Sequence, residues 1–229
     1  MVIIMKYMKK IMLFFVINIL PIAILGLYLY ANIGGAEDVK EVVKNSPFKE
    51  FIYIDHKTIM MLKDNANIKN MPKFYKEVVI LINGIYVGNH GSFGIKIPLG
   101  FLIKYIPIDD FEYYNGVLIK NLNKDDLGKA EINDLINTIP PNYKDVLIYK
   151  ENYVIGIYYD LNSNKTCLVY VFKKSNNQKI DTEKLRNELL QKTNAVDCNV
   201  VDMGDKVYVY LEFNKIDLNL INSGITWKL

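Results

Sequence analysis

Residues 166–213 read TCLVYVFKKSNNQKIDTEKLRNELLQKTNAVDCNVVDMGDKVYVYLEF, and this stretch decides the fold class. Its first and last parts are rich in Val, Tyr and Phe, as strands are, and leucines recur at helical spacing between them. Asp181 stands just before the helical part and is a favourable N-cap residue. The predicted elements are, in order, a strand (166–173), a helix (182–193) and two strands joined at Gly204-Asp205 (196–203 and 206–213).

The same order of elements precedes this stretch. Asn123 caps a predicted helix, and Pro140-Pro141 ends it. The elements are a strand (117–120), a helix (124–138) and two strands (146–150 and 153–160). We therefore predict an α+β fold in which residues 116–229 hold two strand–helix–strand–strand units. Two such units build one antiparallel-rich sheet with both helices on one face, a two-layer sandwich.

Residues 48–115 form a strand-rich region in this interpretation. The segment 49–55 alternates apolar and polar residues, and 78–83 (VVILIN) is a continuous apolar run typical of a buried strand. A turn cluster at 88–92 leads into two further apolar runs, 93–98 and 101–107. Residues 32–47 are predicted to be a juxtamembrane spacer with a short helix near 37–44.

Residues 11–31 read IMLFFVINILPIAILGLYLYA and carry no charge. As a helix they span about 31 Å, which matches the hydrocarbon thickness of a bilayer. Lys6, Lys9 and Lys10 precede the run, so the positive-inside tendency predicts a cytoplasmic segment 1–10, a signal-anchor helix at 11–31 and an exported C-terminal domain. The lipid bilayer is thus the first expected partner. Cleavage near Gly34-Gly35-Ala36 is the alternative, and it predicts a secreted protein.

The charge of the exported part argues against one class of partner. The chain has 28 basic and 25 acidic residues, and its first 31 residues hold three lysines and no acid. Residues 32–229 therefore carry 25 charges of each sign. A domain without net positive charge lacks the electrostatic footprint of a nucleic-acid-binding protein.

Cys167 and Cys198 have two alternative interpretations. Outside the cell they can pair, closing a loop of about 30 residues worth ~3–4 kcal/mol in the chain-entropy model. Alternatively, Cys167 is a catalytic thiolate, with His90 exchanging protons and Arg186 stabilising an oxyanion. Thr166-Cys167 resembles two residues of the cysteine motif of the sortase-type transpeptidases, which use this trio and this topology. The rest of that motif is absent.

Three further features bear on sites. The loop 88–94 (GNHGSFG) has successive amides that can hold an anion, but its place between two strands favours an ordinary hairpin loop. His56 and His90 are the candidate metal ligands, yet no known metal or cofactor motif surrounds them, and we expect no cofactor. Asn164 begins a glycosylation sequon, which is usable only on an exported and exposed loop.

No catalytic motif is complete, so we expect a binding or assembly module on the outer membrane face rather than an enzyme. Tyr158, Tyr159, Tyr170, Tyr208 and Tyr210 lie on neighbouring predicted strands and are candidates for a recognition surface. Two alternatives stay open: an exported, membrane-anchored hydrolase or cysteine transpeptidase, and an accessory subunit of a membrane complex with other membrane proteins as partners.

Overall fold

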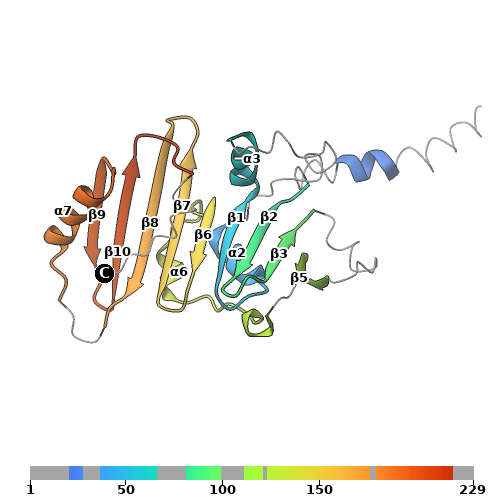
Figure 1. Cartoon of the computed structure of the whole chain (residues 1–229), viewed down its shortest axis with the longest axis horizontal. Coiled ribbons are helices and arrows are strands. Elements are labelled where there is room, and N and C mark those ends of the chain that lie inside the picture. The colour runs from blue at the N-terminus through green and yellow to red at the C-terminus, as the bar shows by residue number, and fades with distance from the viewer. Residues whose placement is uncertain are drawn as a thin grey trace, which may run out of the picture.

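The computed structural model describes residues 21–27, 37–65, 81–98, 111–120, 123–175 and 179–218. Within them, ten strands form one antiparallel sheet in the order β4-β5-β3-β2-β1-β6-β7-β8-β10-β9 (Figure 1). The strands are β1 (Phe51–Asp55), β2 (Gly84–Gly88), β3 (Phe93–Lys96), β4 (Glu112–Tyr114), β5 (Val117–Lys120), β6 (Val146–Tyr149), β7 (Tyr153–Asp160), β8 (Lys165–Lys173), β9 (Asp197–Asp202) and β10 (Lys206–Phe213). The helices that accompany the sheet are α2 (Val39–Asn45), α3 (His56–Asn65), the short 3₁₀ helix η2 (Lys124–Asp126), α6 (Asp134–Thr138) and α7 (Thr182–Lys192).

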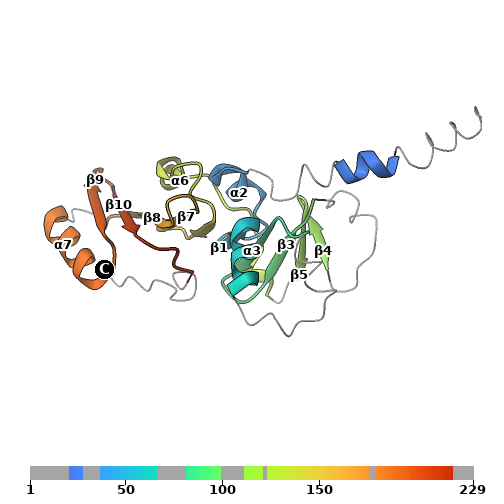
Figure 2. The ribbon, with the colours of Figure 1, turned by 90° about the horizontal axis from the view of Figure 1, so that it is seen from above.

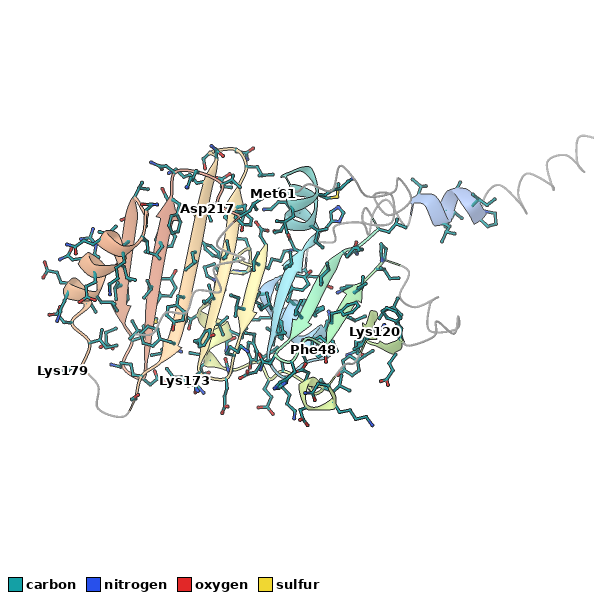
Figure 3. All side chains as sticks on the ribbon, in the orientation of Figure 1. Phe48, Met61, Lys120, Lys173, Lys179 and Asp217 are labelled. Atoms are coloured by element: carbon teal, nitrogen blue, oxygen red, sulfur yellow. The ribbon has the colours of Figure 1, made fainter. Side chains whose placement is uncertain are left out.

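The sheet has two ends that matter for the sites below. β1 runs from Phe51, opposite Gly88 of β2, to Asp55, opposite Gly84. We call the two ends of the sheet the Gly88 end and the Asp55 end. In Figure 3, Lys173 lies at the Gly88 end and Asp217 at the Asp55 end.

One face of the sheet is covered by α2 and α6. Val39, Val42 and Val43 recur at helical spacing in α2, and all three are buried. They share a core cluster with Leu135 and Ile136 of α6 and with residues of the central strands. The segment 32–47, predicted to be a spacer, therefore contains a core helix, and the folded domain includes residues well before 48.

The opposite face is covered by α7. Leu189 of α7 packs in a second cluster with Val207, Val209 and Leu211, the buried alternate residues of β10. Figure 2 shows α7 on the other side of the sheet from α2 and α6. The predicted arrangement with both helices on one face is therefore wrong, because the leucines of α7 meet the Val/Leu face of β10 and not its tyrosine face.

The unit predicted in 166–213 is confirmed element by element, and β8, β10 and β9 are neighbours in the sheet. The strands of the unit predicted in 117–160 are not all neighbours in the sheet. β5 pairs with β3 and β4, and three strands separate it from β6. The mixed α/β class with a large antiparallel sheet holds, but β1 from the first part of the chain lies beside β6.

The helix predicted at 124–138 is also wrong. The chain forms η2, then an extended stretch, then α6. Gly128 has φ +152°, which no helix accommodates. Asn133 accepts hydrogen bonds from the backbone N–H groups of Leu135 and Ile136 and so starts a new helix.

Several predicted segments lie wholly or partly outside the described residues. Of the strand predicted at 78–83, only 81–83 are described, and they precede β2. The run 101–107 is outside. Of the predicted anchor 11–31, only 21–27 are described, and they are helical. Among the residues that the structure describes, no helix has both the length and the apolar character needed to span a membrane.

Candidate ligand-binding cavity

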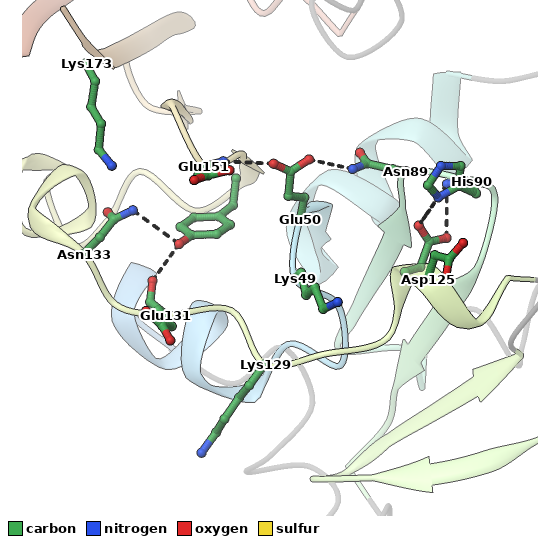
Figure 4. Close-up of a pocket in the computed structure, with 12 residues that line it drawn as sticks. Lys49, Glu50, Asn89, His90, Asp125, Lys129, Glu131, Asn133, Glu151 and Lys173 are labelled. Carbon is green, nitrogen blue, oxygen red and sulfur yellow. Dashed lines mark hydrogen bonds and ion pairs between the residues drawn. The ribbon is translucent and has the colours of Figure 1, made fainter.

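A cavity of about 590 Å³ opens at the Gly88 end of the sheet (Figure 4). Five segments meet around it: the β2–β3 turn, the chain from η2 to α6, the residues leading into β1, the end of β6 with the β6–β7 turn, and the last residue of β8. Eleven of its twelve lining residues are polar or charged, and the twelfth is Tyr149. A cavity of this composition suits a polar ligand better than an apolar one.

Asp126 is a buried carboxylate on one wall of this cavity. Its oxygens accept hydrogen bonds from the backbone N–H of His90 at 3.0 and 3.1 Å and from that of Ser92 at 3.4 Å. A Cβ at Gly88 would lie 2.8 Å from Asp126 Oδ2, so the glycine makes room for the carboxylate. The 88–94 loop is the predicted hairpin connection, and the anion that its amides hold is the protein's own Asp126.

Asp126 also orients the imidazole of His90, whose Nδ1 lies 2.7 Å from Oδ1. Burial by itself raises the pKa of Asp126, but the hydrogen bonds from His90 and Ser92 outweigh it, and the pKa is lowered. The carboxylate therefore stays ionised and keeps a proton on Nδ1. Because Nδ1 faces Asp126, Nε2 is the ring nitrogen left for a ligand. The His90 side chain is 57% exposed.

Glu50 forms the second fixed anion of the cavity. Its carboxylate accepts hydrogen bonds from Asn89 Nδ2 at 2.6 Å, from the backbone N–H of Glu151 at 3.0 Å and from Lys150 Nζ at 3.2 Å. Burial raises the pKa of Glu50, and these hydrogen bonds more than compensate, so the pKa is lowered. Glu50 thereby ties the β2–β3 turn to the β6–β7 turn across the mouth of the cavity.

Tyr149 supplies the aromatic surface of the cavity. Its hydroxyl donates a hydrogen bond to the carbonyl of Glu131 at 2.6 Å and accepts one from Asn133 Nδ2 at 3.3 Å. Burial raises the pKa of Tyr149, and the charge of Glu131 adds to this. The ring therefore stays neutral and fixed in place.

The remaining charged side chains around the cavity are not paired within the described part of the chain. The ammonium groups of Lys49, Lys129 and Lys173 make no hydrogen bond or ion pair there, and the same holds for the carboxylates of Asp125, Glu131 and Glu151. Figure 4 shows these residues on several segments around the cavity, with the side chain of Lys129 pointing away from the others. The cavity thus presents unpaired charges of both signs.

The structure does not bring the predicted catalytic trio together. His90 follows β2, while Cys167 lies on β8, four strand positions away, which is roughly 19 Å. Arg186 is on α7 and donates from Nε to the carbonyl of Cys198 at 2.7 Å. Of the trio, His90 alone lines the cavity.

The two cysteines are free thiols, and both are buried. Cys167 shares a sheet face with Glu212, whereas Cys198 pairs in register with Leu211, whose side chain is on the opposite face. β10 separates β8 from β9, so the two backbones are about 10 Å apart, beyond the reach of a disulfide. Tyr210 Oη lies 3.6 Å from Cys167 Sγ instead.

His56 and His90 lie at opposite ends of β2. His56 follows Asp55, and its Nδ1 is 2.7 Å from the carbonyl oxygen of Ile82. His90 is at the Gly88 end, so the two imidazoles cannot share a metal ion. Among the described residues there is no group of three or more His, Cys, Asp or Glu side chains that could hold one.

The predicted tyrosine surface is divided between the two faces of the sheet. Tyr158 is in register with Cys167, and Tyr208 and Tyr210 share that face. Tyr159 and Tyr170 point to the other face and are buried. Four of the five tyrosines therefore pack in or against one of the two core clusters, and the five do not form one continuous surface on a single face.

Asn164 lies in the exposed turn between β7 and β8, with φ +54°. The sequon's Thr166 is buried, and its hydroxyl bonds the carbonyl of Lys215 and the N–H of Asp217. The asparagine of the sequon is therefore exposed, whereas the hydroxyl of its threonine is already hydrogen-bonded within the fold.

Sequence reasoning missed Asp126, Glu50 and Tyr149 as cavity residues. Position 126 falls in the first turn of the helix predicted at 124–138, which does not form. A signal was present: the loop 88–94 has anion-binding amides but no lysine of the phosphate-loop type, and Gly128 interrupts the predicted helix. Neither observation identifies Asp126 without knowledge of the pairing between strands.

The chain is similar in sequence to a known protein. The chain is 86% identical over 222 residues to "Uncharacterized protein MJ0995" of Methanocaldococcus jannaschii, an alignment that covers 97% of this chain and 98% of that protein. No protein-family model matches the chain. Among solved structures, "Structure of crystal form III of TP0453" aligns with 78% of this chain and 94% of that chain, at 9% identity. Its TM-score of 0.44 is too low to assign a common fold or function.

Proposed function

The chain belongs to one family with the uncharacterized M. jannaschii protein, and for this family we propose a membrane-tethered, exported binding module. Its ligand is a small polar molecule with charged groups of both signs, bound in the cavity at the Gly88 end of the sheet. The observation that carries the proposal is the set of unpaired charges in that cavity, with His90 held in place by Asp126.

The fixed hydrogen bonds around the cavity support ligand binding. Asp126 and Glu50 are each held by several donors, so the walls are preorganised and binding need not order them. The free lysines and carboxylates are then available to a ligand. A zwitterion such as an amino acid or the ends of a short peptide satisfies both sets at once.

The tether is supported by the apolar run 11–31 and the three lysines before it. A secreted form produced by cleavage after this run is the alternative. Both place the domain outside the cytoplasm. A neutral exported part leaves recognition to local charge rather than to a long-range field.

The binding test uses the full chain in detergent, titrated calorimetrically with glycine, glutamate, lysine and glycylglycine. We expect at least one of these probes to bind and His90→Gln to weaken that binding about tenfold, the effect of losing one charge-assisted hydrogen bond. His56→Gln is the matched control, because His56 lies at the other end of β2. Absence of binding by every probe, or equal affinity in both variants and the wild type, contradicts the proposed ligand class.

One observation favours a second function, an exported hydrolase. The Asp126–His90 pair has the geometry by which a carboxylate orients a general base. Among the described residues that line the cavity there is no Ser, Thr or Cys, so water would be the nucleophile. Hydrolysis of a bound dipeptide that His90→Gln abolishes, with binding retained, would favour this function over binding alone.

A further inference from the structure

A second cluster of charged groups lies at the Asp55 end of the sheet, away from the cavity. Asp55 is the last residue of β1, and Asp145 directly precedes β6. β1 and β6 are antiparallel neighbours, so these two side chains meet at the same end of the sheet. Asp55 is 7% exposed and the Asp145 side chain 5% exposed, so two acidic groups are buried together.

Asp145 is firmly held by its neighbours. Its carboxylate forms an ion pair with Lys57 and accepts a hydrogen bond from the backbone N–H of Tyr159 at 2.7 Å. Its carbonyl oxygen accepts from the N–H of Asp55 at 3.0 Å and from the hydroxyl of Thr58 at 2.9 Å. Asp145 thus joins β1, β7 and α3, and it has its own cation.

Asp55 connects the cluster to α3. Its Oδ1 accepts a hydrogen bond from the backbone N–H of Thr58 at 2.8 Å, which caps the first turn of that helix. Its pairing in register places it opposite Asp145, so the two carboxyl groups lie on the same face of the sheet and both are buried. Two ionised carboxylates held together away from water repel each other, which favours a proton on one of them.

Among the described residues, two lysines act on the pair. Lys57 is bound to Asp145 and also to the carbonyl oxygen of Tyr159. Lys144 is a weaker positive influence on Asp55. The described tyrosines that the pair influences are Tyr53 and Tyr159, whose pKa values burial raises, so both stay neutral.

We propose that Asp55 carries a proton beside the Lys57-paired carboxylate of Asp145 and that loss of this proton as the pH rises loosens α3 from the sheet. Loss of the proton leaves a second buried negative charge beside Asp145, and repulsion then separates the two carboxyls. Asp55 carries the N-terminal cap of α3, so the first turn of α3 moves with it. The pair is thus a pH-sensitive contact that links β1, β6 and α3.

The direction of the pH dependence follows from the surroundings. Burial, and then the charge of Asp145, raise the pKa of Asp55 from 3.8 to about 7. The stabilisation is therefore complete below the unfolded-state pKa and is lost as the pH rises through the folded-state pKa. With one extra proton on the folded state, the unfolding equilibrium constant rises about tenfold per pH unit between about pH 5 and 7, and then levels off.

The test measures urea unfolding of the full chain in detergent between pH 5 and 8. Asp55→Asn keeps a helix cap and a hydrogen-bond donor beside Asp145 without a titratable group, so we expect its stability to be flat where that of the wild type falls. Asp181→Asn is the matched control, because Asp181 caps α7 in the same way but is exposed. The stability of this control variant should fall with rising pH as that of the wild type does.

Two measurements on the wild type keep the test decisive if a variant fails to fold. The carboxyl carbon of Asp55 should titrate in NMR with a midpoint near pH 7, and the amides of α3 should exchange about tenfold faster at pH 8 than at pH 6 after correction for intrinsic rates. The proposal is overturned if the Asp55 carboxyl titrates with a midpoint below about pH 5, or if amide exchange in α3 is the same at both pH values. It is also overturned if the stability of Asp55→Asn falls with pH as steeply as that of the wild type.

Discussion

Asp126 and Asp55 are both buried aspartates at ends of the same sheet, and their surroundings shift their pKa values in opposite directions. Around Asp126, donors from the β2–β3 turn outweigh burial and lower the pKa. Around Asp55, burial and a neighbouring carboxyl raise it. The stabilisation from Asp126 is therefore lost as the pH falls below about 4, and that from Asp55 as the pH rises towards 7.

Gly88 gives a prediction at this scale. In Gly88→Ala the new Cβ meets Asp126 Oδ2 at 2.8 Å, and the carboxylate is held by hydrogen bonds on the other side. We expect a loss of about 1–3 kcal/mol in the free energy of unfolding, measured with urea at pH 7. In a protein that already carries Asp126→Ala, Gly88→Ala should lower the free energy of unfolding much less, because the carboxylate that the new Cβ would meet is absent. Equal costs in both backgrounds would show that the two residues do not interact.

The elements of the sheet were predicted best where the pattern is local. β8, α7, β9 and β10 agree with the predicted segments within about one residue at each end, because alternation, leucine spacing and the Asp181 cap are all short-range signals. The helix predicted at 124–138 failed for a long-range reason. Asp126 there binds the β2–β3 turn, more than 30 residues earlier in the chain.

The edge strand β9 gives a prediction at the scale of elements. The carbonyl of Cys198 accepts from Arg186 Nε, and its N–H donates to the side chain of Asp197 at 2.8 Å. These side chains occupy backbone groups that another strand would otherwise pair with. We expect Arg186→Ala to increase self-association, measured by sedimentation velocity of the full chain in detergent. Lys184→Ala, on the same helix, is the control, and equal association in the two variants would contradict this role.

At the scale of the molecule, the proposed tether and the folded domain are different segments of the chain. α2 is part of the core, so the domain includes residues from about 37 onward, and the predicted anchor precedes it. We expect the full chain to stay with membranes after an alkaline wash and a chain lacking residues 1–36 to be released.

A longer deletion is the matched control for folding. Removing residues 1–47 also removes Val39, Val42 and Val43 from the core, and the urea transition should then weaken or disappear. Release of the full chain by the alkaline wash would argue against the anchor. An intact mass lacking the first 31 to 36 residues would favour the secreted alternative.

The sequence by itself determined the α+β class and the elements of 166–213, because strands, helices and caps depend on residues close along the chain. Only the tertiary structure decided that β1 lies between β2 and β6, that α7 covers the face opposite α2 and α6, and that Asp126 meets His90 while Asp55 meets Asp145. Alternating side chains give each strand two faces but do not name its partner. Both charged clusters arise from pairings between distant segments, and their chemistry could only be recognised once those pairings were known.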